Sequence, residues 1–79
     1  MKLSVYSLKK VLFKGEAAQI TCKTEVGEIT ILNNHQPIIG LLAKGTMRII
    51  DGEAREHFLP VVSGFLEVKP SNETRLIIE

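Results

Sequence analysis

The chain has 79 residues, one cysteine and a formal net charge of +1, and 44% of its residues are hydrophobic. This length allows a single domain, which buries only about 60–65% of its unfolded surface. The balanced charge argues against a nucleic-acid binder, which needs a basic stripe to displace phosphate counterions.

The N-terminal part of the chain predicts a short strand followed by a break. Leu3 and Val5 alternate with polar residues, which is typical of a strand with one buried face. A short apolar run follows at residues 11–13 and ends at Lys14-Gly15. Glycine accepts backbone conformations that other residues resist, so Gly15 predicts a turn or a bulge before the next strand.

The next strand is expected over residues 17–23, where apolar and polar side chains alternate. Ala18, Ile20 and Cys22 share one face of it and are predicted to point into the core. The single Cys22 excludes an internal disulfide and fits a reducing compartment. Because no cation and no exposure are indicated for it, Cys22 is interpreted as an inert, buried side chain rather than a nucleophile.

The stretch around which the chain is organised is Gly27 to Ile39, which reads GEITILNNHQPII. It predicts a strand through Ile29 and Ile31 that breaks at Asn33-Asn34. Asparagine tolerates the left-handed backbone region, so these two residues predict a turn. Pro37 fixes its own φ and favours an extended residue before it, which begins another strand.

Residues 38–42 are strand-like, and a hairpin is predicted farther along, between residues 46–50 and 53–62. Asp51-Gly52 joins the two runs. Asp-Gly is the strongest short-range hairpin signal because both turn residues accept positive φ. Pro60 has no N–H to donate to a ladder, so its strand is expected at an edge or at a bulge.

The last two strands are expected at residues 65–68 and 75–78, joined by a hairpin loop at residues 70–72. Turn signals therefore recur about every 8–12 residues, and no window holds a helical period. This pattern is typical of an all-β sandwich or a small barrel. No apolar run reaches the roughly 18–20 residues of a membrane span. The hydrophobic stretch before Lys9-Lys10 at the N-terminus is too short for a secretory signal.

Catalytic patterns are weak. His35 and His57 lie on different predicted elements and show no zinc-ligand spacing. An acid–base pair of Glu28 and His35 is conceivable, since both flank one short strand. No glycine-rich phosphate loop occurs, and Ser63-Gly64 lacks the G-x-S-x-G pattern of a nucleophile elbow. The sequence therefore favours a protein without an active site.

Surface patterns are more informative. Three adjacent apolar pairs occur at Ile38-Ile39, Leu41-Leu42 and Phe65-Leu66. In an extended strand one member of each pair faces outward. Outward apolar side chains on a small domain indicate a partner surface, although burial of both sheet faces explains the pattern equally well.

Four segments carry a consistent set of motifs. They are Phe13 to Glu16 for F-x-G-E, Gly27 to Pro37 for G-E-[LI]-[GT]-[IV]-L-x-[GN]-H-x-P, Lys44 to Ile49 for K-P-G-x-[LM]-[RK]-[IV], and Ser63 to Val68 for S-G-G-F-[LA]-E-V. In this order, and nearly without gaps over all 79 residues, they resemble the N-terminal β-sandwich of the epsilon subunit of the rotary F-type ATP synthase, called delta in mitochondria.

The chain departs from that family at several turns. Asn33 replaces the usual Pro, Gln36 replaces the usual Ala, Pro60 has no usual counterpart, and S-G-G is shortened to Ser63-Gly64. The family's C-terminal helical hairpin, which restrains ATP hydrolysis and in some members binds ATP, has no counterpart before the chain stops at Glu79. We therefore expect this polypeptide to couple rotation without restraining hydrolysis and without binding nucleotide.

The resemblance implies one domain over residues 1–79, a flattened β-sandwich of about 8–10 short strands, in the central stalk. Its partners are then the gamma subunit and the c-ring, and the catalytic sites lie on other subunits, so neither enzymatic activity nor a cofactor is expected. By position in the family, Glu28 faces the polar loops of the c-ring, and Ser7, His35 and Gly40 face gamma.

The same resemblance implies that the isolated chain is a monomer and does not insert into the membrane. In the assembled enzyme, which is driven by protons or sodium ions, it is expected on the cytoplasmic face of the inner membrane or its organelle equivalent. Two alternatives remain. One is a free-standing small β-sandwich adaptor that has left the enzyme. The other is a small β-barrel enzyme that uses Glu28 and His35.

Overall fold

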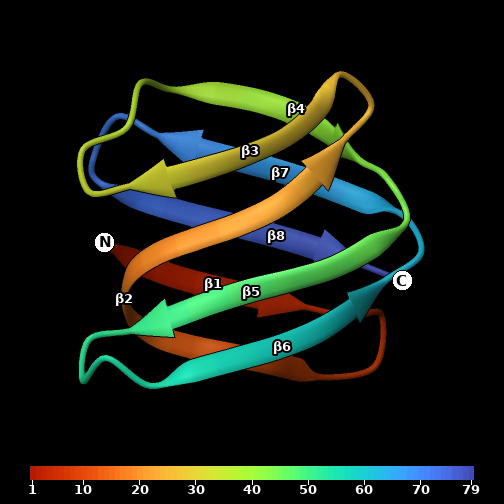
Figure 1. Ribbon diagram of the computed structural model, residues 1–79. Helices are drawn as coiled ribbons and strands as arrows, with labels where there is room; N and C mark the ends of the chain where they lie inside the picture. Colours follow the sequence, from red (N-terminus) through yellow and green to blue (C-terminus); the bar gives the residue numbers. More distant parts are fainter.

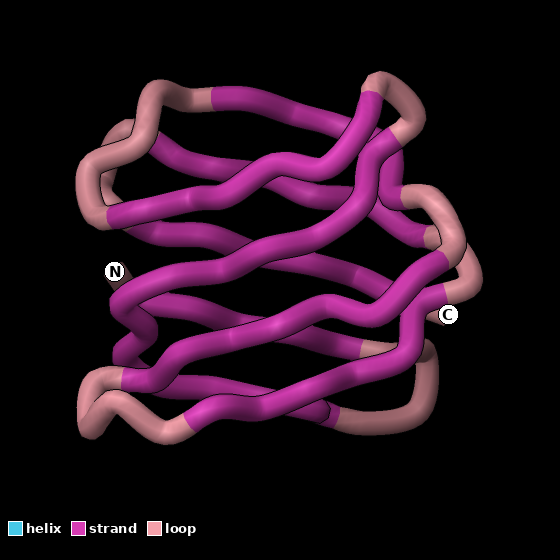
Figure 2. The backbone as a smooth tube through the Cα atoms, viewed as in Figure 1, coloured by secondary structure: helices cyan, strands magenta, loops and turns pink.

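The structure is a computed structural model that describes all 79 residues, and it contains eight strands and no helix. The strands are β1 (Lys2–Tyr6), β2 (Val11–Thr24), β3 (Gly27–Leu32), β4 (Ile38–Leu42), β5 (Gly45–Asp51), β6 (Glu56–Val61), β7 (Gly64–Lys69) and β8 (Glu73–Ile78). Figures 1 and 2 show these strands stacked in two layers, so the predicted all-β sandwich is confirmed.

The long strand β2 belongs to both layers. Residues 11–16 of β2 pair with β1, which continues through β8 and β7 to β4; we call this layer the first sheet. Residues 17–24 pair with β3 on one side and with β5, followed by β6, on the other; this is the second sheet. In Figure 1, β2 begins at the bottom of the molecule, turns at the left near the N-terminus and crosses upward to the right.

Two predictions for β2 need correction because the strand bends without ending. Gly15 lies inside β2 with φ +153 and begins no turn, and the bulge that was the other expectation occurs after it, at Ala18. The pairing with β5 then shifts register between Ala17 and Gln19, which leaves Ala18 as an extra, bulged residue. A one-residue shift reverses the face of the side chain, so Ala17 is buried and Ala18 is exposed, while Ile20 and Cys22 are buried as expected.

The core lies between the two sheets and is built from alternate residues of the strands. It comprises Met1, Leu3, Val5, Ala17, Ile20, Cys22, Ile31, Leu42, Met47, Ile49, Val61, Leu66, Val68, Leu76 and Ile78. Burying each large aliphatic side chain contributes about 1.5–3 kcal/mol. No buried side-chain nitrogen or oxygen is left without a hydrogen-bond partner.

The corner after β3 has the predicted geometry. Asn34 has φ +60, and its N–H donates to the side-chain oxygen of Asn72 at 2.7 Å. Asn72 in turn donates from its amide nitrogen to Asn33 Oδ1. The α-ammonium of Met1 also donates to Asn33 Oδ1 and to the carbonyl of Ala17. The corner therefore joins the N-terminus, the β3–β4 loop and the β7–β8 loop at one end of the sandwich.

The hairpin between β5 and β6 differs from the predicted two-residue turn. Its connection runs over residues 52–55, and the residue with positive φ is Ala54, at +65, rather than Gly52. The carboxylate of Asp51 explains the longer loop, because its Oδ1 accepts the N–H groups of Glu53 and Arg55, each at 2.9 Å. The expectation for Pro60 is confirmed, since β6 is the last strand in the sheet order.

Candidate functional site

Glu28 and His35 do not form the conceivable acid–base pair. Glu28 is the second residue of β3, and His35 lies in the loop beyond its last residue, Leu32. At about 3.3 Å per residue, Leu32 is already about 13 Å from Glu28. The Nδ1 atom of His35 lies 2.7 Å from the carbonyl oxygen of Gln36. The structure therefore does not support the alternative of a small enzyme in which these two residues act as a pair.

His57 has a partner that the sequence did not predict. Its Nε2 atom lies 2.8 Å from Asp51 Oδ2, and its ring meets the ring of Phe13 edge-on, with centroids 5.1 Å apart. The His57 hydrogen bond, followed by the backbone N–H of Arg55, holds the pKa of the Asp51 carboxyl well below its ordinary range. Both carboxylate oxygens of Asp51 are occupied in closing the hairpin, so we assign this pair a structural role.

Cys22 matches its interpretation as a buried, unreactive side chain. It lies on the inner face of β2 and is free of disulfides. Burial, with a smaller contribution from the charge of Glu28, raises the pKa of its thiol to about 11. The thiolate that a nucleophile requires is therefore scarce at neutral pH.

The most extensive functional feature is an apolar row on the outer face of the first sheet. Cross-strand pairs place Leu41 beside Phe65, Phe65 beside Ile77, Ile77 beside Tyr6, and Tyr6 beside Val11, so that the row crosses five strands. Four of these side chains are exposed and Tyr6 is partly exposed, with Phe65 at 57%. Contiguous apolar surface is the feature by which interaction sites on small domains are commonly recognised.

The three apolar pairs identified in the sequence divide as predicted between the core and this face. Leu42 and Leu66 are buried and Ile38 is partly buried, whereas Leu41, Phe65 and Ile39 point outward, Ile39 with 79% of its surface exposed. Tyr6, Ile77 and Val11 were not predicted as part of the surface. Each lies on a strand whose alternation is visible in the sequence, but only the register brings them beside Phe65.

The four residues assigned to partners by resemblance lie at different places on the sandwich. Glu28 is exposed at the start of β3, opposite Lys23, and takes part in no ion pair. Ser7 begins the β1–β2 loop, where its hydroxyl oxygen accepts the N–H groups of Lys9 and Lys10.

His35 lies in the β3–β4 loop, at the opposite end of the sandwich from Ser7 (Figure 1). Gly40 lies in the middle of β4 and lines an apolar groove of about 300 Å³ together with Ile29 of β3 and Leu66 of β7. The structure thus brings Gly40 beside β3, the strand that carries Glu28, while Ser7 and His35 remain far apart.

Comparison with known proteins agrees with these observations. Residues 1–77 match the model of one protein family, described as the beta-sandwich domain of the ATP synthase delta/epsilon chain. The chain belongs to this family. Among curated relatives, it is 37% identical over 75 residues to the ATP synthase epsilon chain of Dichelobacter nodosus and 39% identical over 77 residues to that of Herminiimonas arsenicoxydans.

These alignments cover 95% and 96% of this delta/epsilon-family chain, but 52% and 55% of the two relatives. The chain therefore spans about half the length of the curated relatives it matches.

Solved structures share the fold of this delta/epsilon-family domain. One chain of the Euglena gracilis mitochondrial ATP synthase, in a structure of OSCP, F1 and c-ring, superimposes with a TM-score of 0.92 at 22% identity, covering 99% of this chain and 49% of that one. One chain of the central stalk and c-ring of the Tetrahymena thermophila mitochondrial ATP synthase superimposes with a TM-score of 0.84 at 17% identity. This match covers 99% of the present chain and 62% of the Tetrahymena chain. No helix in the structure has the length and apolarity that a membrane span requires.

Proposed function

We propose that this domain is a non-catalytic rotor subunit of an F-type ATP synthase, which couples rotation of the c-ring to the gamma subunit during proton- or sodium-driven ATP synthesis. It acts as a peripheral part of the F1 sector, on the cytoplasmic face of the inner membrane or its organelle equivalent. Membership of the delta/epsilon family supports the proposal, as does the fold shared with chains from structures described as containing the c-ring and the central stalk.

The observation that carries the proposal is the apolar row on the first sheet. Leu41, Phe65, Ile77, Tyr6 and Val11 form a continuous strip of side chains that face outward. When a partner covers such a strip, each Å² of apolar surface removed from water contributes about 25 cal/mol of favourable free energy. This contribution favours a stable contact over a transient one. We assign the apolar row to gamma, together with the apolar groove beside Gly40. The loop residues Ser7 and His35, which lie at opposite ends of the sandwich, are assigned to gamma by the resemblance alone.

Glu28 is assigned to the c-ring. It is exposed at the start of β3 and takes part in no ion pair, so its carboxylate is free to meet a cation on a partner. A charge at the rim of an interface steers docking and fixes orientation more than it adds affinity. Glu28→Lys is therefore expected to slow assembly and alter its salt dependence while leaving the isolated domain folded.

Reconstitution tests the proposed function. The purified chain is added to the ATP synthase of the same source after removal of its epsilon subunit, and ATP-driven ion pumping is measured. The proposal predicts restored pumping per ATP hydrolysed and co-purification with gamma and the c-ring. If the chain does not bind the depleted enzyme, the alternative of a free-standing adaptor is favoured instead.

Two matched variants test the assignment of the apolar row. Phe65→Ser removes an exposed side chain from the first sheet, and Leu32→Ser removes one of similar exposure, 54%, from β3 in the second sheet. Phe65→Ser is expected to weaken binding to gamma by about tenfold or more, and Leu32→Ser to leave it nearly unchanged. Equal effects of the two variants would show that the apolar row is not the gamma surface.

A further inference from the structure

The outer face of the first sheet also carries a charged half, at the end where the N-terminus lies. Two neighbouring rows of side chains cross the same four strands, in the order β7, β8, β1 and β2. The first row is Lys69, Glu73, Lys2 and Glu16. The second row is Glu67, Arg75, Ser4 and Lys14.

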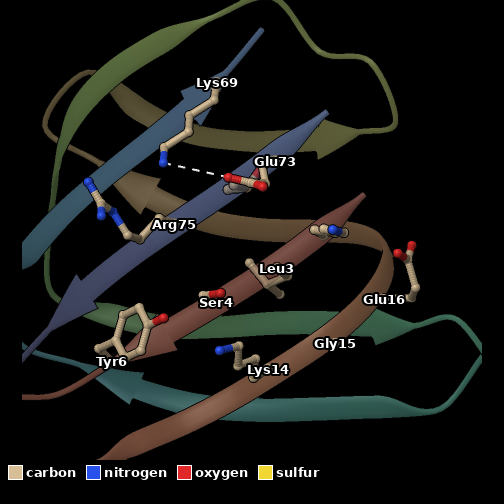
Figure 3. Close-up of a pocket in the computed structure, with 11 residues that line it drawn as sticks. Leu3, Ser4, Tyr6, Lys14, Gly15, Glu16, Lys69, Glu73 and Arg75 are labelled. Atoms are coloured by element: carbon tan, nitrogen blue, oxygen red, sulfur yellow. Dashed lines mark ion pairs between the residues drawn. The ribbon is translucent and has the colours of Figure 1, made fainter. Parts of the chain in front are cut away.

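The charges in these rows alternate in sign in both directions, along each strand and across each pair. Direct neighbours on a sheet face have Cβ atoms about 4.5–5.5 Å apart, so alternation places each charge beside opposite charges. Two of the resulting ion pairs are close: Lys69 to Glu73 at 3.5 Å and Arg75 to Glu67 at 2.8 Å. Figure 3 shows the first of these as a dashed line.

Ser4 is the one position at which the alternation fails. The pattern requires a negative charge there, because Arg75 and Lys14 flank Ser4 across the sheet and Lys2 precedes it on the same face of β1. Lys2 and Lys14 take part in no ion pair within the domain. Within the two rows, four cations therefore face three carboxylates, and the surplus positive charge is centred on Ser4.

The same position is recessed. Serine is the shortest side chain in the two rows, and it lies in a cavity of about 490 Å³ that Lys2, Lys14, Arg75 and Tyr6 also line. Figure 3 shows the side chains of Tyr6, Lys14 and Arg75 arranged around Ser4. Hydroxyl groups of Ser4 and Tyr6 add hydrogen-bond donors to the positive charges, which is the chemistry that holds an oxyanion.

We propose that the recess over Ser4 binds one carboxylate from an acidic side chain of a protein partner. A single negative charge completes the alternation, whereas a phosphate dianion exceeds it. Glu16 and Glu73 also line the cavity and repel a run of phosphates, which disfavours nucleic acid. Because the apolar row crosses the same sheet face, one partner that contacts both is held in a single orientation. The proposal does not depend on the rotor function.

The first test introduces the missing negative charge by a substitution at Ser4 itself. Ser4→Asp supplies the missing charge, and Ser4→Asn is the neutral control of the same shape. At low salt, Ser4→Asp is expected to unfold at a higher urea concentration than Ser4→Asn, and the difference should shrink in high salt because surface charges are screened. It should also shrink in a Lys14→Gln background. A difference of the same size in both backgrounds would overturn the proposal.

The second test measures binding directly. A blocked Gly-Glu-Gly tripeptide is titrated into the ¹⁵N-labelled chain at fixed ionic strength, with Gly-Gln-Gly as control and inorganic phosphate as a separate arm. The proposal predicts shifts of the Ser4 and Lys14 amide signals with the glutamate peptide alone, affinity reduced roughly two- to fivefold by Lys14→Gln, and no binding to Ser4→Asp. Equal shifts with Gly-Gln-Gly, or tighter binding of phosphate, would refute a carboxylate site.

Discussion

Gly64 offers a strong test of how this sandwich is held together. It begins β7 with φ +154, a backbone conformation that residues other than glycine rarely adopt. A Cβ atom on Gly64 would lie 2.2 Å from the carbonyl oxygen of Ile77 and 2.9 Å from the Cα of Ile78. Both atoms belong to the backbone of β8, so the substitution Gly64→Ala forces β7 and β8 apart rather than displacing a flexible side chain.

The expected cost follows from two contributions. A non-glycine residue in a sparsely populated backbone region costs about 1–3 kcal/mol, and overpacking at a tight contact costs about 1–3 kcal/mol more. Gly64→Ala should therefore lower the free energy of unfolding by about 2–6 kcal/mol. A domain of 79 residues has a total stability of only about 4–12 kcal/mol, so this loss is a large part of it.

Urea unfolding followed by far-ultraviolet circular dichroism measures this loss. With a slope near 1 kcal/mol per M, the midpoint of Gly64→Ala should fall by about 2 M or more. Gly40→Ala is the matched control, because nothing lies within 4 Å of its Cβ position and its φ is not positive. The control should stay within about 1 kcal/mol of the original chain. A Gly64→Ala midpoint equal to that of the control would refute the steric argument.

Three further predictions concern the loops and the core. Ala54, with φ +65, is strained, so Ala54→Gly should raise the free energy of unfolding by up to about 1 kcal/mol, and a lower thermal midpoint would contradict this. The pKa of Asp51 is lowered from its ordinary 3.8, so its contribution to stability is complete above pH 4 and is lost as pH falls below that value. Asp51→Asn should therefore flatten the fall of the urea midpoint between pH 4 and pH 2.5; an unchanged acid profile would show that Asp51 does not cause it. Because burial raises the pKa of Cys22 to about 11, a thiol reagent at pH 8 should modify the chain only in urea, and rapid labelling of the folded chain would disprove the buried position.

Local errors in the sequence-based predictions have specific physical causes. Ala18 was predicted to be buried because strict alternation was assumed, and the bulge reverses its face. Asp51-Gly52 was predicted to form a two-residue turn, but the Asp51 carboxylate accepts two backbone N–H groups and stabilises a longer loop. The bulge depends on the pairing of β2 with β5, whereas the longer loop depends on hydrogen bonds of the Asp51 side chain to the backbone, which compete with the Asp-Gly turn. Alternation and turn propensity describe the local chain and do not include such contacts.

The sequence by itself determined the all-β class, the placement of most strands, the turn at Asn34 and the edge position of Pro60, because each depends on side-chain alternation or on backbone preferences of single residues. Only the tertiary structure decided which outward side chains meet. The cross-strand pairing that joins Tyr6, Ile77 and Phe65 in the apolar row also surrounds Ser4 with cations. A shift of one residue in the pairing of β1 with β8 would turn the outward side chains of β1 inward and abolish both surfaces, and no pattern along a single strand encodes that register.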